Sequence, residues 1–192
     1  MAEKKYTPMM QHYLKMKEEN PDSILFYRLG DFYEMFFEDA KLVSQELDLV
    51  LTGRSAGVEE KVPMCGIPFH AANSYIQRLV KKGYKVAICE QLEDPSSAKG
   101  LVDRGIIKII TPGTYMDATM DAKSTNYMAS CDVSSFEITV IYCELSTGEL
   151  KYQTLQRSLV ALQKALLEQN VSELVCPMTM DKKWIAALEE MD

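Results

Sequence analysis

A turn signal at Gly30-Asp31 constrains how the N-terminal half of this chain can fold. Glycine reaches positive φ without strain, and aspartate hydrogen-bonds back to its local backbone, so the pair favours a reversal of the chain. It follows an apolar run at residues 24–27 that is typical of a strand, and it precedes an alternating run at residues 32–37. The sequence therefore predicts a strand, a turn and a second extended segment.

The alternation predicts which side chains of residues 32–37 point the same way. In an extended segment Phe32, Glu34 and Phe36 share one face, and the residues between them face the other side. A phenylalanine in so apolar a run is ordinarily a core residue, and a single glutamate in it ordinarily faces water. An aromatic ring and a carboxylate two residues apart are also a useful pair to present to a ligand. Phe32 and Glu34 are therefore the main candidate binding residues.

Composition indicates an ordinary globular protein, because 47% of the 192 residues are hydrophobic and 26% are charged. No apolar run approaches the ~18 residues of a membrane span, and the N-terminus lacks the apolar core of a signal peptide. We therefore expect a cytoplasmic protein with no membrane contact. The five cysteines are widely spaced, without a Cys-x-x-Cys pair, so reduced thiols are expected rather than a zinc site or a disulfide framework.

The net charge of −7 opposes extensive contact with nucleic acid, since phosphate contacts need lysine and arginine. DNA binding is compatible with this charge only if a small local patch of this chain contacts the duplex while other parts of a larger protein bind the phosphate backbone.

The hydrophobic patterns predict a mixed α/β chain with a first domain up to about residue 120. Its expected elements are a helix from Thr7-Pro8 to Asn20-Pro21, a strand at 24–28, a helix at 38–47, a strand at 49–52, an extended segment at 62–70, a helix at 71–82 closed by Gly83, and strands at 84–90 and 106–111, with loops at 53–61 and 94–100.

Residues 117–124 have the composition of a linker, and the pattern changes after them. Three strand-like runs at 127–133, 136–145 and 149–155 are joined by short Ser- and Gly-containing segments, which predicts an antiparallel meander. A helix at 159–168, a strand at 173–176 and the start of a helix at 183–190 follow. Residues 121–192 are therefore expected to form the first part of a second, truncated domain.

The run from Gly30 to Glu34 resembles the signature near the N-terminus of the MutS family of DNA mismatch-recognition proteins. In that family the phenylalanine wedges into the duplex at the mispair, and the glutamate two positions on hydrogen-bonds the mispaired base. Phe32 and Glu34 match these two positions. Further blocks similar to the family, in order, cover essentially the whole chain: 7–13, 25–28, 63–71, 87–91 and 111–114.

The resemblance implies both a fold and a function. Residues 1–120 would be the mismatch-recognition domain, a mixed sheet flanked by helices, and residues 121–192 the N-terminal portion of a connector domain, a partial RNase H-like α/β domain. The implied function is recognition of mispaired or unpaired bases in duplex DNA by an aromatic wedge and a base-contacting glutamate, which initiates DNA mismatch repair.

Four further residues are possible DNA contacts by the same resemblance: Arg54, Ser55, Lys61 and Met64. In the family this region lies against the DNA backbone and the minor groove. The residues themselves fit a solvated loop and a core methionine equally well. Asp132 is interpreted as structural, because no partner acids accompany it in the sequence.

The resemblance also implies partners and cofactors for the full-length protein. These are mismatched double-stranded DNA, a second copy in a homodimer, MutL, and ATP with magnesium for a DNA-dependent ATPase. No Gly-x-x-x-x-Gly-Lys-[Ser/Thr] phosphate loop occurs here, so this segment is expected to hold no cofactor or metal and to be no enzyme.

Two other classes of function remain open at this point. A nuclease could bind two magnesium ions through four acids, Asp31, Glu34, Glu38 and Asp39, although the last two fit a helix N-terminus and no lysine or histidine completes the site. A pure interaction module would only dock other domains. A metal-dependent cleavage assay and a gel shift with mismatched duplex would separate these alternatives.

Overall fold

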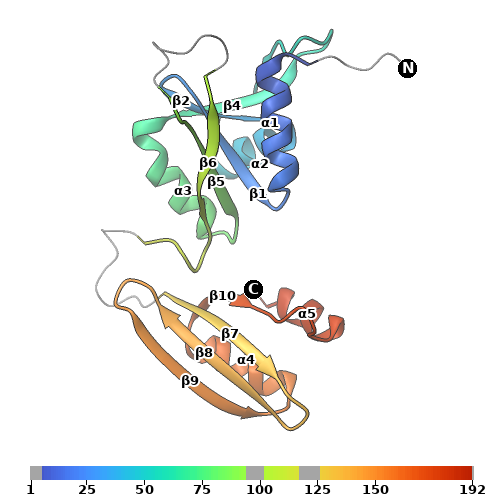
Figure 1. Ribbon diagram of the computed structural model, residues 1–192, viewed down its shortest axis with the longest axis vertical. Coiled ribbons are helices and arrows are strands. Elements are labelled where there is room, and N and C mark those ends of the chain that lie inside the picture. The colour runs from blue at the N-terminus through green and yellow to red at the C-terminus, as the bar shows by residue number, and fades with distance from the viewer. Residues whose placement is uncertain (1–5, 94–101, 117–125, 192) are drawn as a thin grey trace. The chain divides into compact units, whose positions relative to one another are not determined.

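The computed structural model describes residues 6–93, 102–116 and 126–191. The chain separates into two compact units, Met1–Thr111 and Pro112–Asp192 (Figure 1). The expected loop at 94–100, the expected linker at 117–124 and the expected boundary after residue 120 lie outside the described residues.

The first unit is a six-stranded mixed sheet in the order β3-β4-β2-β1-β5-β6. Only β1 and β5 are parallel neighbours, and every other pair is antiparallel. The strands are β1 (Ser23–Leu29), β2 (Phe32–Phe36), β3 (Thr52–Arg54), β4 (Val62–Pro68), β5 (Lys85–Gln91) and β6 (Arg104–Ile110); the helices are α1 (Pro8–Glu19), α2 (Phe37–Leu47) and α3 (Ala72–Val80), with a short 3-10 helix, η1 (Phe69–Ala71). The mixed α/β class is confirmed.

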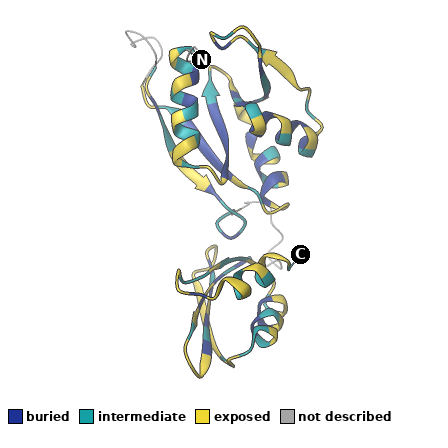
Figure 2. Ribbon diagram, turned by 90° about the vertical axis from the view of Figure 1, so that its right-hand side faces the viewer, coloured by how far each residue is buried: buried dark blue, intermediate teal, exposed yellow. Residues whose placement is uncertain are grey.

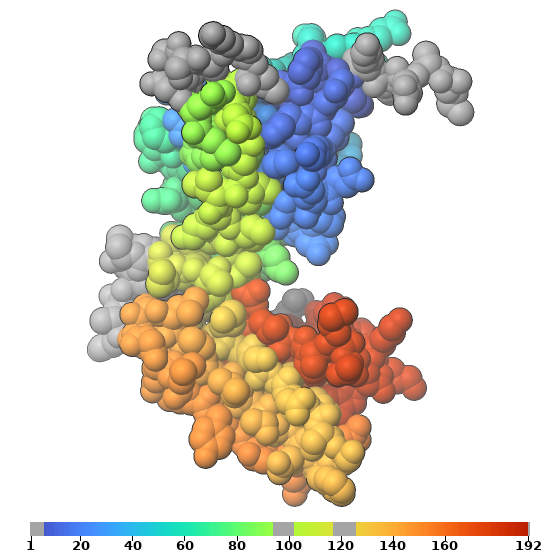
Figure 3. Space-filling view, in the orientation of Figure 1, coloured from blue at the N-terminus to red at the C-terminus, as the bar shows by residue number. Residues whose placement is uncertain are grey.

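Helices cover both faces of this sheet. Side chains of α1 pack on the face that carries Tyr27 and Phe36, whereas α2 contacts the opposite face, where Cys65 donates to the carbonyl of Ala40 at 3.4 Å. The central strands β1 and β5 are buried over most of their length (Figure 2). The edge strand β3 is more exposed. In the space-filling view, α1 and β6 form adjacent parts of the surface of this unit (Figure 3).

The prediction of a strand at residues 49–52 is wrong in its position, because β3 begins at Thr52 and continues to Arg54. The helix α2 ends with Asp48 in the left-handed conformation, and the amide of Leu49 still bonds the carbonyl of Ser44 at 2.9 Å. The residues between Leu47 and Thr52 therefore lead the chain away from the end of α2, and only after them does the chain pair with β4. Strand pairing therefore starts three residues later than the apolar pattern suggests.

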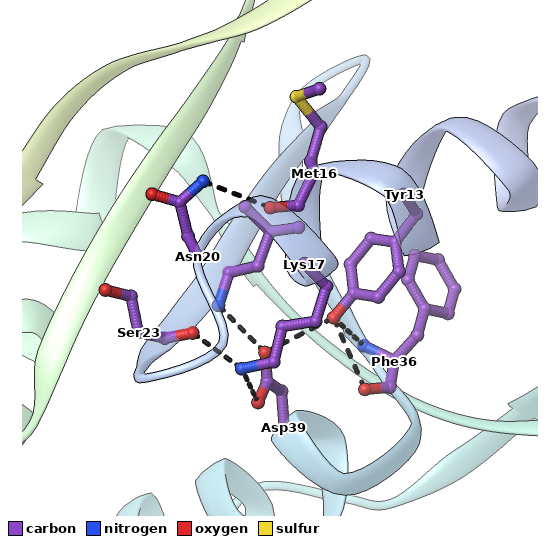
Figure 4. A network of polar contacts seen from close by, with 8 residues as sticks. Tyr13, Met16, Lys17, Asn20, Ser23, Phe36 and Asp39 are labelled. Atoms are coloured by element: carbon purple, nitrogen blue, oxygen red, sulfur yellow. Dashed lines mark hydrogen bonds and ion pairs between the residues drawn. The ribbon is translucent and has the colours of Figure 1, made fainter.

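A buried carboxylate joins α1, β1 and α2 (Figure 4). Asp39 accepts a hydrogen bond from the amide of Leu25 at 2.9 Å and from Lys17 Nζ at 2.9 Å, and the Tyr13 hydroxyl lies 3.4 Å from it. The same hydroxyl accepts from the amide of Phe36 at 3.2 Å, and burial raises the pKa of Tyr13. This network fixes the end of β2 against α1.

The second unit is a four-stranded sheet in the order β10-β7-β8-β9, with helices packed on one face. Its elements are β7 (Tyr127–Val133), β8 (Glu137–Glu144), β9 (Glu149–Gln156), α4 (Leu159–Glu168), β10 (Val171–Val175) and α5 (Lys182–Glu189). The predicted antiparallel meander is confirmed by the pairing of β7 with β8 and of β8 with β9, and β10 adds parallel to β7. The side chain of Asp132 is exposed on β7.

All five cysteines are free thiols, as expected, and burial raises the pKa of Cys65 and Cys131 to about 12. Within residues 6–93, 102–116 and 126–191, no helix is both long and apolar enough to cross a membrane.

The turn after β8 supplies a pH-dependent contribution to stability. Glu144 accepts hydrogen bonds from the Ser146 hydroxyl at 2.8 Å and from the amide and hydroxyl of Thr147 at 2.7 and 2.6 Å, and these bonds lower the pKa of its carboxyl to about 2. A folded-state pKa below the unfolded value of about 4.3 stabilises the fold above pH ~4.3, and this stabilisation disappears as the pH falls toward 2.

We therefore expect Glu144→Gln to lower the stability of the second unit at pH 7 and to flatten its stability change between pH ~4 and ~2. Urea unfolding followed by fluorescence of Trp184, the sole tryptophan, which packs on the core of this unit, measures the effect directly. Glu137→Gln, at an exposed residue of the same strand, is the control. Equal acid dependence in the Glu144→Gln variant and the wild type would contradict the prediction.

Candidate nucleic-acid interface

The candidate site begins at the hairpin formed by β1 and β2. Leu29 pairs with Phe32 across the two-residue turn, in which Gly30 has φ +57°. Glycine adopts that backbone conformation without steric cost, so the turn signal in the sequence is used as expected. The hairpin places Phe32 at the very start of β2.

Phe32 and Phe36 lie on the same face of β2 but in different environments. The ring of Phe36 is buried against Tyr13 of α1, with ring centroids 4.9 Å apart in an edge-to-face arrangement. The side chain of Phe32 is 46% exposed. The ordinary expectation that a phenylalanine in this run is a core residue therefore holds for Phe36 and fails for Phe32.

Glu34 lies beside Phe32 on this face. It pairs with Gly66 of β4, which has no side chain to cover it. A Cβ built on Gly66 would lie 3.5 Å from Glu34 Cγ and 3.9 Å from Phe32 Cδ1, so the acid and the ring border the same piece of bare backbone. The structure thus brings together the two residues that the alternation singled out.

Arg54 is the partner of Glu34. Its guanidinium, at the end of β3, forms an ion pair with the Glu34 carboxylate and lies 6.0 Å from the ring centroid of Phe36. The sequence placed Arg54 in a loop among possible DNA contacts, and its pairing with Glu34 was not foreseen. Only the register of β3 on β4 and of β4 on β2 brings the two side chains to one face.

The other possible contact residues lie farther from the hairpin turn. Met64 is half-buried and packs against the core cluster on the α1 side of the sheet. Ser55 and Lys61 are exposed at the two ends of the loop that follows β3. Met64 therefore fits its interpretation as a core methionine, whereas the other two are available to solvent.

Sequence reasoning missed a second group of side chains, which supports the hairpin from the opposite face. The Arg28 guanidinium lies 3.7 Å from the ring centroid of Phe69 and 3.3 Å from Glu90, and the Tyr33 hydroxyl donates to the same carboxylate. The amide of Phe69 donates to the carbonyl of Asp31 in the turn at 2.9 Å, and burial raises the pKa of Tyr33 to about 12. The alternation placed Tyr33 on this face, but its distant partners had no sequence signal.

The acids of residues 31–39 do not converge on one point. Glu34 and Glu38 each pair with a basic side chain, while Asp39 is enclosed in the buried network. Over the part of the chain that the structure describes, no three His, Cys, Asp or Glu side chains are grouped to hold a metal ion. This arrangement does not fit the two-metal nuclease considered from the sequence.

Comparison with known proteins adds independent findings. The family model described as MutS domain I matches residues 7–119. The chain is 54% identical over 177 residues to the DNA mismatch repair protein MutS of Clostridium botulinum (strain Loch Maree / Type A3), a match covering 87% of this chain and 19% of that protein. It is 58% identical over 146 residues to the protein of the same name from Clostridium tetani (strain Massachusetts / E88), covering 76% of this chain and 17% of that protein. The chain thus spans about a fifth of the length of these relatives.

Proposed function

The chain belongs to the MutS family, and from that premise we propose that its first unit recognises mispaired or unpaired bases in duplex DNA. In this proposal Phe32 is the wedge and Glu34 contacts the displaced base. The observation that supports this proposal is that the exposed ring of Phe32 lies beside the Glu34 carboxylate on one face of the sheet. The neighbouring part of the same face is buried under α1.

An exposed phenylalanine suits the wedge role on physical grounds. Its ring is large and apolar, and it can stack on a base while it separates a base step. Unstacking costs a few kcal/mol per step, and a mispaired step, already poorly stacked, bends and opens more easily. Preference for mispaired DNA can then arise from deformability, which suits a protein that accepts many kinds of mispair.

Glu34 suits the base contact for a different reason. A carboxylate close to phosphates is repelled, so it is useful there only if a base donates a hydrogen bond to it. The Watson–Crick edges of correctly paired bases are already hydrogen-bonded to each other, so those edges gain nothing from this acceptor. The glutamate therefore favours displaced bases over paired ones.

We propose further properties for the full-length protein, of which this chain is the N-terminal part. They are a homodimer, interaction with MutL, a cytoplasmic location, and an ATPase that uses ATP with magnesium. The ATP site would lie outside this chain, because no glycine here is followed by lysine as a phosphate loop requires. The chain itself is proposed to have no catalytic role.

The test is a binding comparison with the full-length protein. Fluorescence anisotropy would measure its affinity for three duplexes of one sequence: fully paired, with a single mispair, and with one unpaired nucleotide. Tighter binding to the second and third is expected, without strand cleavage when magnesium is added. Equal affinity for all three would support a pure docking module, and magnesium-dependent cleavage would support a nuclease; either would refute the proposal.

The isolated 192-residue chain is expected to bind DNA poorly. Its net charge of −7 leaves few phosphate contacts, and bending a site costs about 1–6 kcal/mol that contacts elsewhere must offset. We expect a dissociation constant weaker than about 10⁻⁴ M at physiological salt, with slight preference for a mispair. Titration of labelled mispaired and matched duplexes with the purified chain measures both quantities. Tight, mispair-selective binding would show that this chain alone can bend the duplex.

A further inference from the structure

The Glu34 carboxylate forms an ion pair with Arg54 within the first unit. Glu34 is on β2 and Arg54 is on β3, with β4 between them in the sheet. The arginine side chain has to reach across β4 to form this ion pair. Gly66, which pairs with Glu34 on β4, adds no side chain of its own beside the Glu34 side chain.

The two partners differ in their exposure. The side chain of Arg54 is 38% exposed and that of Glu34 is 16% exposed, so the carboxylate is the more enclosed group. Its stem lies against the backbone of Gly66 beside the Phe32 ring, and its charge is directed to the guanidinium. The ion pair therefore determines where the carboxylate lies relative to the exposed ring.

Resting on the proposed function, we propose that Arg54 is a positioning residue for mispair recognition and acts through Glu34. It holds the carboxylate of Glu34 beside the ring of Phe32. Arg54 Nη1 donates to one oxygen of the Glu34 carboxylate. A guanidinium is well suited to this task, because it is planar and its N–H donors point in fixed directions.

This role differs measurably from a direct contact of Arg54 with a phosphate. Loss of a phosphate contact weakens binding to matched and mispaired duplex equally. It also reduces, by about 0.9, the steepness of the plot of the logarithm of the binding constant against the logarithm of the salt concentration. Loss of positioning instead lowers the ratio of the two affinities, and this effect requires Glu34. Two residues that act through one contact give non-additive effects in a double-mutant cycle.

The experiment measures matched and mispaired affinities of the full-length protein in four forms: wild type, Arg54→Ala, Glu34→Gln and the double variant. We expect Arg54→Ala to reduce the preference for the mispair about fivefold to tenfold, at the low end of what one base-contacting side chain contributes. The Glu34→Gln variant keeps Phe32 and should therefore keep some preference for mispaired over matched duplex. The double variant should show the same residual preference as Glu34→Gln alone. Arg54→Lys, which keeps the charge, should recover part of the loss.

Arg78→Ala is the control for removal of one positive charge, because Arg78 is an exposed arginine on α3 that pairs weakly with Asp48 at 3.9 Å. It should leave the preference unchanged. Equal loss on both duplexes, a further fall of the residual preference in the double variant, or no recovery with lysine would overturn the inference. Absence of any mispair preference in the wild type would instead refute the proposed function, so the two failures are distinguishable.

Discussion

Replacing Phe32 with alanine in the full-length protein should abolish its preference for mispaired duplex while leaving its fold intact. A core phenylalanine replaced by alanine costs about 3–5 kcal/mol. The ring of Phe32 is half-exposed, and surface substitutions usually cost about 0.5 kcal/mol or less. Without the ring, nothing separates the base step, and the mispaired duplex loses its advantage in deformability. Anisotropy titrations with both duplexes and a thermal unfolding curve measure the two halves of this expectation.

The matched control is Phe136→Ala, which removes an exposed phenylalanine from the second unit. That variant should retain the full preference for mispaired DNA. A large fall in the melting temperature of the Phe32→Ala variant would place the ring in the core, and a retained preference would remove it from the recognition step.

Replacing Asp39 with alanine should cause a large loss of stability in the first unit. It leaves the amide of Leu25 and the ammonium of Lys17 without their acceptor, and removing one partner of a buried ion pair costs about 3–5 kcal/mol. Because the Lys17 side chain is 28% exposed, we expect the lower end of that range, about 3 kcal/mol. Urea unfolding of the 192-residue chain followed by far-ultraviolet circular dichroism measures the loss.

Glu38→Ala is the matched control, since Glu38 is the exposed neighbour whose pairing with Lys41 is worth less than about 1 kcal/mol. Fluorescence of Trp184 reports on the second unit in the same samples. A transition of the first unit that is unchanged in Asp39→Ala would show that the buried network contributes little to the fold.

Local patterns predicted most of the secondary structure in the described residues. The turn at Gly30, the N-cap at Thr7 and the meander at residues 127–155 each follow from signals within a few residues. The strand β3 was misplaced, because the apolar residues after α2 are taken up in leaving the helix. The order of the six strands depends on contacts distant in sequence, and no periodicity contains that information.

The candidate site was only partly predictable for the same reason. The alternating sequence predicted that Phe32 and Phe36 share one face of the strand. Phe36 is buried because α1 packs over it, whereas Phe32 is exposed, and the alternation does not contain this difference. The pairing of Glu34 with Arg54 requires two sheet registers at once. The RNase H-like assignment of residues 121–192 stays a prediction. So do the DNA-binding roles of the site residues, which are Phe32, Glu34, Arg54, Ser55, Lys61 and Met64.

The most direct test of the central claim is whether Phe32 opens the base step at a mispair. A fluorescent adenine analogue, 2-aminopurine, placed beside the mispair reports unstacking as a rise in emission when the full-length protein binds. We predict a rise with the mispaired duplex, little change with the matched duplex, and no rise with Phe32→Ala at protein concentrations that saturate the DNA. The same rise with Phe32→Ala as with the wild type would contradict the assignment of Phe32 as the wedge.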